Sequence, residues 1–192
     1  KKTKPEKNCR CFPRQRSQSE KSGADGAVSL ADFLDPQELS ALYERFVLAY
    51  FRRHHPHLRA GAPWVNGGIE DAPVFLPGLH TDIVLTGPAR TLIIDTKCYG
   101  RILGSRYDRQ ILSPANRNQI YSYVMHEASD PRQGGREVAG MLLYAQTAVD
   151  PPIRETWTET GHRFHVRTLD LDRDFTEIAA QLDDVAALLA PA

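Results

Sequence analysis

The chain has 192 residues, a length that fits one domain or one domain with a tail. Its 41% hydrophobic and 25% charged residues allow a buried core, and no segment resembles a membrane span or a signal peptide, so we expect a cytoplasmic protein with no membrane partner. The formal net charge is 0, from 24 basic and 24 acidic residues, which taken alone argues against a nucleic-acid binder.

The basic residues are concentrated at the start of the chain. Residues 1–27 carry eight Lys or Arg against three acidic residues, a net charge of +5, so the remaining residues carry −5. Phe12 is the one large apolar side chain in this segment, and burial therefore cannot offset the entropy of ordering it. We expect a disordered basic arm at 1–27 and a folded domain at 28–192. The three cysteines are too few for a disulfide framework and indicate free thiols in a reducing compartment.

A strong helix signal begins just after this arm. Asp35 suits the N-cap, Pro36 suits the first helical position, and Glu38 has the capping-box spacing. Apolar residues then recur at three- and four-residue steps through about Arg53, which predicts an amphipathic helix. Glu44 falls at the rim of the apolar stripe, where it either borders a cleft or faces water.

Two short stretches rich in β-branched residues follow a connector rich in Pro and Gly. They span residues 80–85 and 91–97, and the short Gly-Pro turn between them favours an antiparallel pair.

The rest of the chain predicts one more helix, two more strands and a closing helix. The second helix is expected at 114–127, and the strands at 138–146 and 163–171. Apolar residues spaced from Phe175 to Leu189 indicate the closing amphipathic helix. This order of elements predicts an α/β or α+β layer fold, with one mixed central sheet flanked by helices. The sequence has no Gly-rich phosphate loop, so we expect no nucleotide hydrolysis by this chain itself.

The chemistry is concentrated around residues 82 to 97. Side chains on a strand alternate between faces, so Asp95 and Lys97 share one face. Burying both at the end of so apolar a strand is costly unless each is paired or bound to a metal. If the preceding strand brings Asp82 alongside, two carboxylates meet, and hard oxygen ligands of this kind favour Mg²⁺.

Such a site suits the hydrolysis of phosphodiester bonds. We expect Asp82, Asp95 and the backbone carbonyl of Thr96 to hold the metal, which would activate water. Lys97 would orient that water or stabilise negative charge on the phosphate, and Glu44 would bind the metal through water or complete a second site. The alternative is a surface strand end that carries a weak Asp-Lys ion pair.

Other polar residues support a DNA-binding interpretation. Gln119 and Tyr123 stand at positions i and i+4, where both can reach Lys97 or a phosphate; the alternative is an ordinary helix face with a packed Tyr and an exposed Gln. Residues 90–118 carry six basic and two acidic side chains, a local net charge of +4 that favours phosphate contacts from Arg101, Arg106 and Arg117.

A group of three histidines closes the first predicted helix. His54, His55 and His57 are potential metal ligands, but at a helix C-terminus such residues more often complement the dipole and cap carbonyls.

These residues resemble known nucleases. Asp82, Asp95-Thr-Lys97 and Glu44 resemble the PD-(D/E)xK motif, which implies a restriction-endonuclease-like core, and Gln119-Ile-Tyr-Ser-Tyr123 resembles the Gln-xxx-Tyr helix of its RecB-like branch. A longer set of segments, spread over roughly residues 32 to 190, resembles the nuclease region of the McrC family. They are Leu42-Tyr-Glu-Arg-Phe-Val, Leu76-Pro-Gly-Leu-His-Thr-Asp-Ile-Val-Leu, Ile93-Ile-Asp-Thr-Lys-Cys-Tyr, Asn118-Gln-Ile-Tyr-Ser-Tyr, Met141-Leu-Leu-Tyr and Thr168-Leu-Asp-Leu.

The resemblance implies an endonuclease subunit of a modification-dependent restriction system. McrC joins the hexameric AAA+ GTPase McrB, stimulates its hydrolysis of GTP, and cuts DNA that carries modified cytosine. The implied cofactor is Mg²⁺, with Mn²⁺ as a substitute, and GTP enters only through the partner. McrC proteins engage the GTPase with a separate N-terminal region, where this chain has only its short basic arm. A truncated or stand-alone nuclease, a non-catalytic GTPase-stimulating subunit and a RecB-like repair nuclease therefore remain as alternatives.

Overall fold

A computed structural model describes most of the chain beyond its first 34 residues. The expected arm at 1–27 lies outside the described residues, which are 35–65, 71, 73, 75–76, 78–98, 103–106, 109–146 and 151–190.

The first helix, α1, forms where its local signals predict it. It spans Pro36–His54, and the Asp35 side chain accepts hydrogen bonds from the backbone N–H groups of Gln37 and Glu38. The Glu38 carboxylate accepts the Asp35 N–H in return, which completes the capping box. The buried face of α1 consists of Tyr43, Val47, Tyr50 and Phe51.

A five-stranded mixed sheet forms the centre of the molecule, with strand order β3-β4-β7-β9-β8. β4 pairs with β3 in the antiparallel sense and with β7 in the parallel sense; β9 lies parallel to β7 and antiparallel to β8. The strands are β3 Ile83–Thr86, β4 Arg90–Lys97, β7 Glu137–Ala145, β8 Arg154–Glu159 and β9 His162–Leu169.

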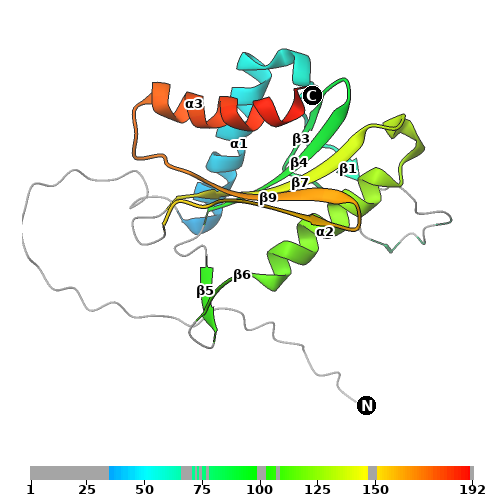
Figure 1. Cartoon of the computed structure of the whole chain (residues 1–192), viewed down its shortest axis with the longest axis horizontal. Coiled ribbons are helices and arrows are strands. Elements are labelled where there is room, and N and C mark those ends of the chain that lie inside the picture. Colours follow the sequence, from blue (N-terminus) through cyan, green and yellow to red (C-terminus); the bar gives the residue numbers. More distant parts are fainter. Residues whose placement is uncertain are drawn as a thin grey trace, which may run out of the picture.

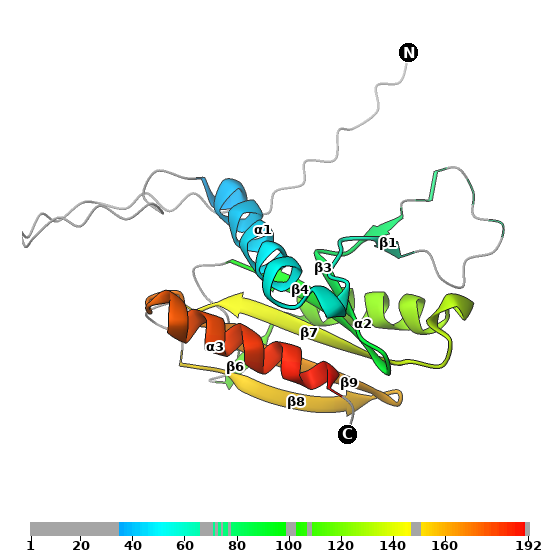
Figure 2. The same cartoon turned by 90° about the horizontal axis from the view of Figure 1, so that it is seen from above.

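Helices cover both faces of this sheet (Figures 1 and 2). α1 and α3 (Phe175–Ala186) lie on one face, and α2 (Pro114–Ala128) lies on the other. Alternate residues of β4 enter the two cores: Leu92 and Ile94 pack with α1 and α3, whereas Ile93 packs with α2. The predicted α+β fold with a mixed sheet between helices is confirmed. No helix in the described ranges has both the length and the apolar character needed to cross a membrane.

The predicted strand at 80–85 is wrong in its first half. The chain forms β2 (Leu79–His80), which pairs with β1 (Trp64–Val65), and enters the main sheet only as β3 at Ile83. The break occurs because the backbone N–H and the hydroxyl of Thr81 both bind the carbonyl of Pro63.

Several elements lie outside the sequence prediction. β8 is missing from it because this edge strand is mostly exposed and carries little apolar signal. The hairpin of β5 (Leu103–Arg106) and β6 (Arg109–Leu112) is also missing. The predicted strand at 163–171 ends earlier, at Leu169. The described residues also form the 3₁₀ turns η2 Pro56–Leu58, η3 Pro131–Gln133 and η4 Ala187–Leu189, and η4 directly follows α3.

Gly140 allows α2 to approach β7 closely. A Cβ atom there would lie 2.8 Å from side-chain atoms of both Ile120 and Val124, and 3.0 Å from Phe164. These atoms belong to well-packed side chains, two of them on α2, so the absence of a Cβ sets the distance of the helix from the sheet.

We predict that Gly140→Val destabilises the fold by about 1–3 kcal/mol, because overpacking pushes α2 away from the sheet. Urea unfolding followed by circular dichroism measures the loss. The control is Ala139→Val, which adds a larger side chain at a half-buried position on the other face of β7. Gly161 does not serve as a control, because its positive φ would strain any replacement. Equal stability of Gly140→Val and the parent would contradict this packing.

His165 on β9 is buried in a neutral form. Its ring Nδ1 lies 2.9 Å from the Thr156 hydroxyl, and its side chain is 6% exposed. Burial is the main cause that lowers the pKa of His165 to about 4, and the positive charges of Arg167 and Arg163 add to it.

We predict an acid-sensitive contribution to stability from this residue. The unfolded chain binds a proton near pH 6.5 and the native chain only near pH 4, so the stabilisation is complete above pH 6.5 and is lost as the pH falls towards 4. The loss is on the order of 2–3 kcal/mol. Urea unfolding at pH 7 and pH 4.5 measures how far the free energy of unfolding falls between the two pH values. This fall should be smaller for His165→Gln than for the parent, and equal falls would refute the assignment.

Candidate active site

The end of β4 carries a buried ion pair. Asp95 is 0% exposed and Lys97 is 8% exposed, and Lys97 Nζ lies 2.6 Å from Asp95 Oδ2. Both lie on one face of the strand, as the sequence predicts, and the structure shows that α2 covers this face.

The Asp95 carboxylate is only partly satisfied by this pair. Burial raises the pKa of Asp95 to about 6, Lys97 opposes this shift, and the negative charges of Asp82 and Glu44 reinforce it. Asp95 Oδ1 is fully buried and has no hydrogen-bond donor among the described residues. A buried oxygen of this kind is costly, and a hard cation would satisfy it.

Asp82 lies at the bend just before β3 and reaches the residue between the members of this pair. Its Oδ2 accepts hydrogen bonds from the backbone N–H of Thr96 at 2.7 Å and from the Thr96 hydroxyl at 2.8 Å. The pairing of β3 with β4 ends at Ile83 and Ile94. The Asp82 carboxylate therefore accepts the backbone N–H of Thr96 at a point where β3 no longer pairs with β4. This contact fixes Asp82 beside the Asp95 and Lys97 strand end.

Glu44 of α1 lies near the same carboxylates from the other side of the sheet. It is half-buried, and its pKa is raised, first by burial and then by the negative charge of Asp82. The nearby His80 and Arg45 side chains act in the opposite direction and lower the pKa of Glu44. Glu44 therefore shares the electrostatic environment of Asp82, which fits its predicted place at the rim.

The two polar residues of α2 that the sequence singles out meet the ion pair. Lys97 Nζ donates to Gln119 Oε1 at 3.1 Å, and Gln119 Nε2 donates to the Tyr123 hydroxyl at 2.9 Å. Their i and i+4 positions put both side chains on the face of α2 that covers β4 and β7. A chain of contacts therefore runs from Asp95 through Lys97 and Gln119 to Tyr123.

The predicted basic residues are not all placed at this site. Arg117 forms an ion pair with Glu159 of β8, with 2.6 Å between Arg117 Nη2 and Glu159 Oε1. Arg101 lies outside the described residues, and Arg106 belongs to β5, where only the backbone is described.

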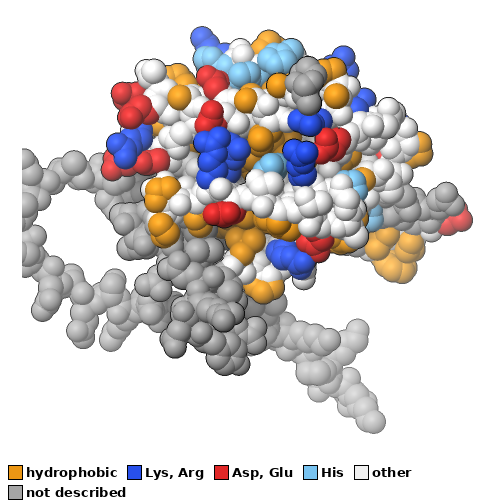
Figure 3. Space-filling view, viewed as in Figure 1, with side chains coloured by type: hydrophobic (Ala, Val, Ile, Leu, Met, Phe, Trp, Pro, Cys, Tyr) orange, Lys and Arg blue, Asp and Glu red, His pale blue; other side chains and the backbone are white. Residues whose placement is uncertain are grey.

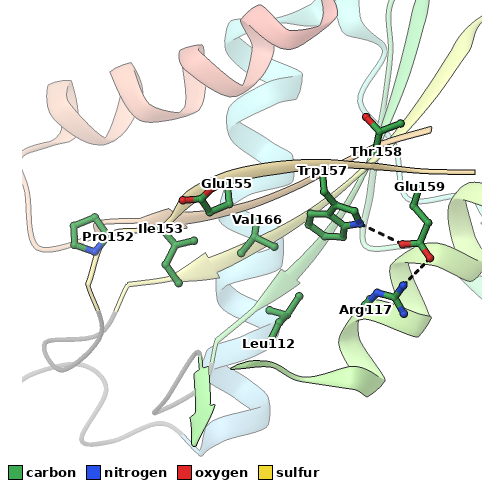
Figure 4. Close-up of a pocket in the computed structure, with 9 residues that line it drawn as sticks. All are labelled: Leu112, Arg117, Pro152, Ile153, Glu155, Trp157, Thr158, Glu159 and Val166. Atoms are coloured by element: carbon green, nitrogen blue, oxygen red, sulfur yellow. Dashed lines mark hydrogen bonds and ion pairs between the residues drawn. The ribbon is translucent and has the colours of Figure 1, made fainter. Parts of the chain in front are cut away.

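Arg117 and Glu159 flank a groove of about 640 Å³ (Figure 4). Its apolar lining includes Ile153, Trp157 and Val166. Asp82, Asp95 and Glu44 are not among its lining residues. It is separate from the candidate active site.

The histidines at the end of α1 have structural partners. His55 Nε2 lies 2.7 Å from Asp183 Oδ1, an oxygen that also accepts the Tyr50 hydroxyl at 2.7 Å. The His54 ring stacks on Tyr50, with 4.6 Å between ring centroids. The His55 and Tyr50 contacts with Asp183 fasten the end of α1 to α3, which gives His55 a structural role.

The face shown in Figure 3 mixes charges of both signs over α3, β8 and β9. Arg154 pairs with Asp184, and Arg173 pairs with Asp170. Basic side chains on this face are therefore already neutralised locally, which makes it a poor surface for a polyanion.

Sequence reasoning missed Asn116 and His80. Asn116 Nδ2 donates to the buried hydroxyl of Tyr144, the residue that stands opposite Lys97 in β7, at 2.8 Å. Its spacing of three residues before Gln119 is a signal that the two share a helix face. No local pattern marks His80, because its proximity to Glu44 depends on how α1 crosses the sheet.

A comparison with curated proteins finds a protein of similar sequence. The chain is 26% identical over 153 residues to a protein described as "Type IV methyl-directed restriction enzyme EcoKMcrBC" from Escherichia coli strain K12. The match covers 78% of this chain and 42% of that protein, so the chain spans less than half the length of its relative. No family model matches the chain. The similarity confirms the McrC-like resemblance expected from the motifs, while the PD-(D/E)xK assignment stays a prediction.

We predict that Gln119 and Tyr123 are energetically coupled. Gln119→Leu and Tyr123→Phe each remove the hydrogen bond between them, so each should lower the free energy of unfolding by about 1 kcal/mol. The double variant should lose less than the sum of the two, because both single changes break the same bond. Urea unfolding of the four proteins measures this cycle, and strict additivity would show that the contact contributes nothing.

Proposed function

We propose that this chain is a Mg²⁺-dependent DNA endonuclease subunit of a McrBC-type, modification-dependent restriction system. The observation that carries the proposal is the group formed by Asp82, Asp95, Lys97 and Gln119 at the end of β4. Lys97 pairs with Asp95 and donates to Gln119, and Asp82 is held by the adjacent Thr96. Asp95 Oδ1 is buried there without a hydrogen-bond donor among the described residues. The similarity to a type IV restriction enzyme supports the biological setting.

The donor set fits a hard divalent cation. Asp95 Oδ1 has no hydrogen-bond donor among the described residues, and Asp82 is held beside Thr96, whose carbonyl would be a further oxygen ligand. Within the described ranges, no three His, Cys, Asp or Glu side chains are grouped closely enough to hold a metal ion by themselves. Mg²⁺ would therefore be held by Asp82, Asp95, the Thr96 carbonyl and water, with Glu44 acting through water. Mn²⁺, which accepts the same ligands, would substitute.

The bound cation would polarise the phosphate and activate a water molecule. The ammonium of Lys97 is then placed to orient that water or to stabilise the charge that develops on the phosphate oxygens. Burial of Lys97 keeps competing solvent away from its charge, and its contact with Gln119 holds the ammonium at a fixed place.

Gln119 and Tyr123 act as positioning residues in this scheme. Gln119 uses its oxygen for Lys97 and its amide N–H group for Tyr123, so its orientation is fixed at both ends. α2 carries both residues and is set against the sheet by Gly140, which ties the packing of the helix to the geometry of the site.

The partners follow from the same proposal. DNA that carries modified cytosine is the substrate, and an McrB-like AAA+ GTPase would recognise the modification and supply GTP hydrolysis. The neutral net charge of the chain supports this division of labour, because weak intrinsic affinity for a polyanion calls for a partner that delivers the duplex.

We predict that Asp95→Asn reduces the cutting of DNA at least ~100-fold, since the amide removes a metal ligand and keeps the shape of the side chain. Cleavage of plasmid DNA that contains 5-methylcytosine is measured with Mg²⁺, GTP and an McrB-like partner. Removal of Mg²⁺ with a chelator should abolish cleavage, and Mn²⁺ should restore it.

The matched control is Asp183→Asn, which changes a hydrogen-bonded carboxylate on α3 and should cut DNA at the rate of the parent. Far-ultraviolet circular dichroism verifies that both variants fold. Full Mg²⁺-dependent cleavage by Asp95→Asn would refute the catalytic assignment. Stimulation of the partner's GTP hydrolysis without any cleavage by the parent would favour a non-catalytic subunit.

A further inference from the structure

An exposed aromatic pair lies on the ribbon that leads into the candidate site. β1 and β2 are antiparallel, with Trp64 directly opposite His80. The two rings meet edge to face, with 5.0 Å between centroids and an angle of 73°. Trp64 is 61% exposed, although a side chain of this size is usually well covered.

The backbone beneath this pair is firmly anchored. Val65, next to Trp64, is 2% exposed, and Thr81 binds the Pro63 carbonyl through both its N–H and its hydroxyl. Gly61 and Val84 exchange two backbone hydrogen bonds of 3.0 and 2.7 Å. Trp64 is therefore held out to solvent by an ordered ribbon that is continuous with β3.

The ribbon stands beyond β3, outside the edge of the central sheet (Figure 2). It leads directly into the site, because only Thr81 separates His80 from Asp82. His80 and Arg45 both lie within electrostatic range of Glu44, so two basic side chains are near the carboxylates on this side. Proteins that bind single nucleic-acid strands combine basic groups with exposed aromatic side chains, and here this combination adjoins the candidate site.

We propose that Trp64, backed by His80, is a stacking platform for a nucleobase of the DNA strand that is cut. This inference rests on the proposed nuclease function and adds a substrate-binding residue to it. A base stacked on Trp64 would bring the neighbouring backbone towards Asp82, which lies two residues after the ring partner His80. Stacking requires a base that has left the duplex stack, so the platform takes an unstacked nucleotide near the scissile phosphate and is tolerant of base identity, since every base offers a π face.

Intrinsic fluorescence tests the platform directly, because the chain has two tryptophans, Trp64 and Trp157. In the Trp157→Phe protein, all tryptophan emission comes from Trp64. Titration with a 12-nucleotide single-stranded oligonucleotide, with Ca²⁺ in place of Mg²⁺ to prevent cutting, should quench this emission. A duplex of the same sequence with blunt, G·C-clamped ends should quench it less.

Binding by fluorescence anisotropy of a labelled oligonucleotide provides the second readout. Trp64→Ala should weaken binding about tenfold, the loss expected for one stacked base, whereas Trp64→Phe should stay within about threefold of the parent. The matched control is Phe175→Ala, an aromatic residue on α3 that is 56% exposed. It should bind like the parent. In cleavage assays Trp64→Ala should raise KM more than it lowers kcat.

The proposed stacking role of Trp64 is refuted if Trp64 emission does not respond to DNA, or if Trp64→Ala binds and cuts DNA like the parent. An unchanged response to DNA together with loss of GTPase stimulation by Trp64→Ala would assign the surface to the protein partner and also overturn it. Failure of the nuclease proposal is distinguishable, because it shows as cleavage by Asp95→Asn or none by the parent, while quenching of Trp64 is measured without catalysis.

Discussion

The fully buried carboxylate of Asp95 lies near the end of β4, and the other residues of the candidate site are arranged around it. Burying Asp95 costs free energy that its contact with Lys97 offsets only in part, as the raised pKa of Asp95 shows. The apolar strand before it has no freedom to turn this side chain outwards, because Leu92, Ile93 and Ile94 are fixed in cores on both faces. The fold therefore leaves a buried carboxylate oxygen without a hydrogen-bond donor near the end of β4, where a cation would satisfy it.

The three other members of the site arrive from separate elements. Asp82 is held by Thr96, on the strand itself; Gln119 is held through Lys97 on the α2 side; Glu44 approaches with α1 from the opposite side. Each of these contacts also links two elements of the fold, so the packing that stabilises the protein and the geometry of the site are the same set of interactions. Such overlap explains why an arrangement with repelling carboxylates persists in a stable domain.

Local signals predicted a large part of this picture. The capping box fixes the start of α1, period-two alternation puts Asp95 and Lys97 on one face, and the i and i+4 spacing puts Gln119 and Tyr123 on another. Prediction failed where the signal is not local. β8 is an exposed edge strand with little apolar pattern, and the strand expected at 80–85 breaks because Thr81 finds its partner in Pro63, eighteen residues away.

The sequence by itself determined the helices, the main strands and the identity of the polar residues that could carry chemistry, because periodicity and capping act within a few residues. Only the tertiary structure decided that Asp82 accepts hydrogen bonds from Thr96 and that Lys97 donates to Gln119. It also decided that Arg117 pairs with Glu159 and that Trp64 remains exposed. The physical reason is that burial and long-range hydrogen bonding set these outcomes. A charge becomes costly, and a partner necessary, only once distant elements close over it and exclude water.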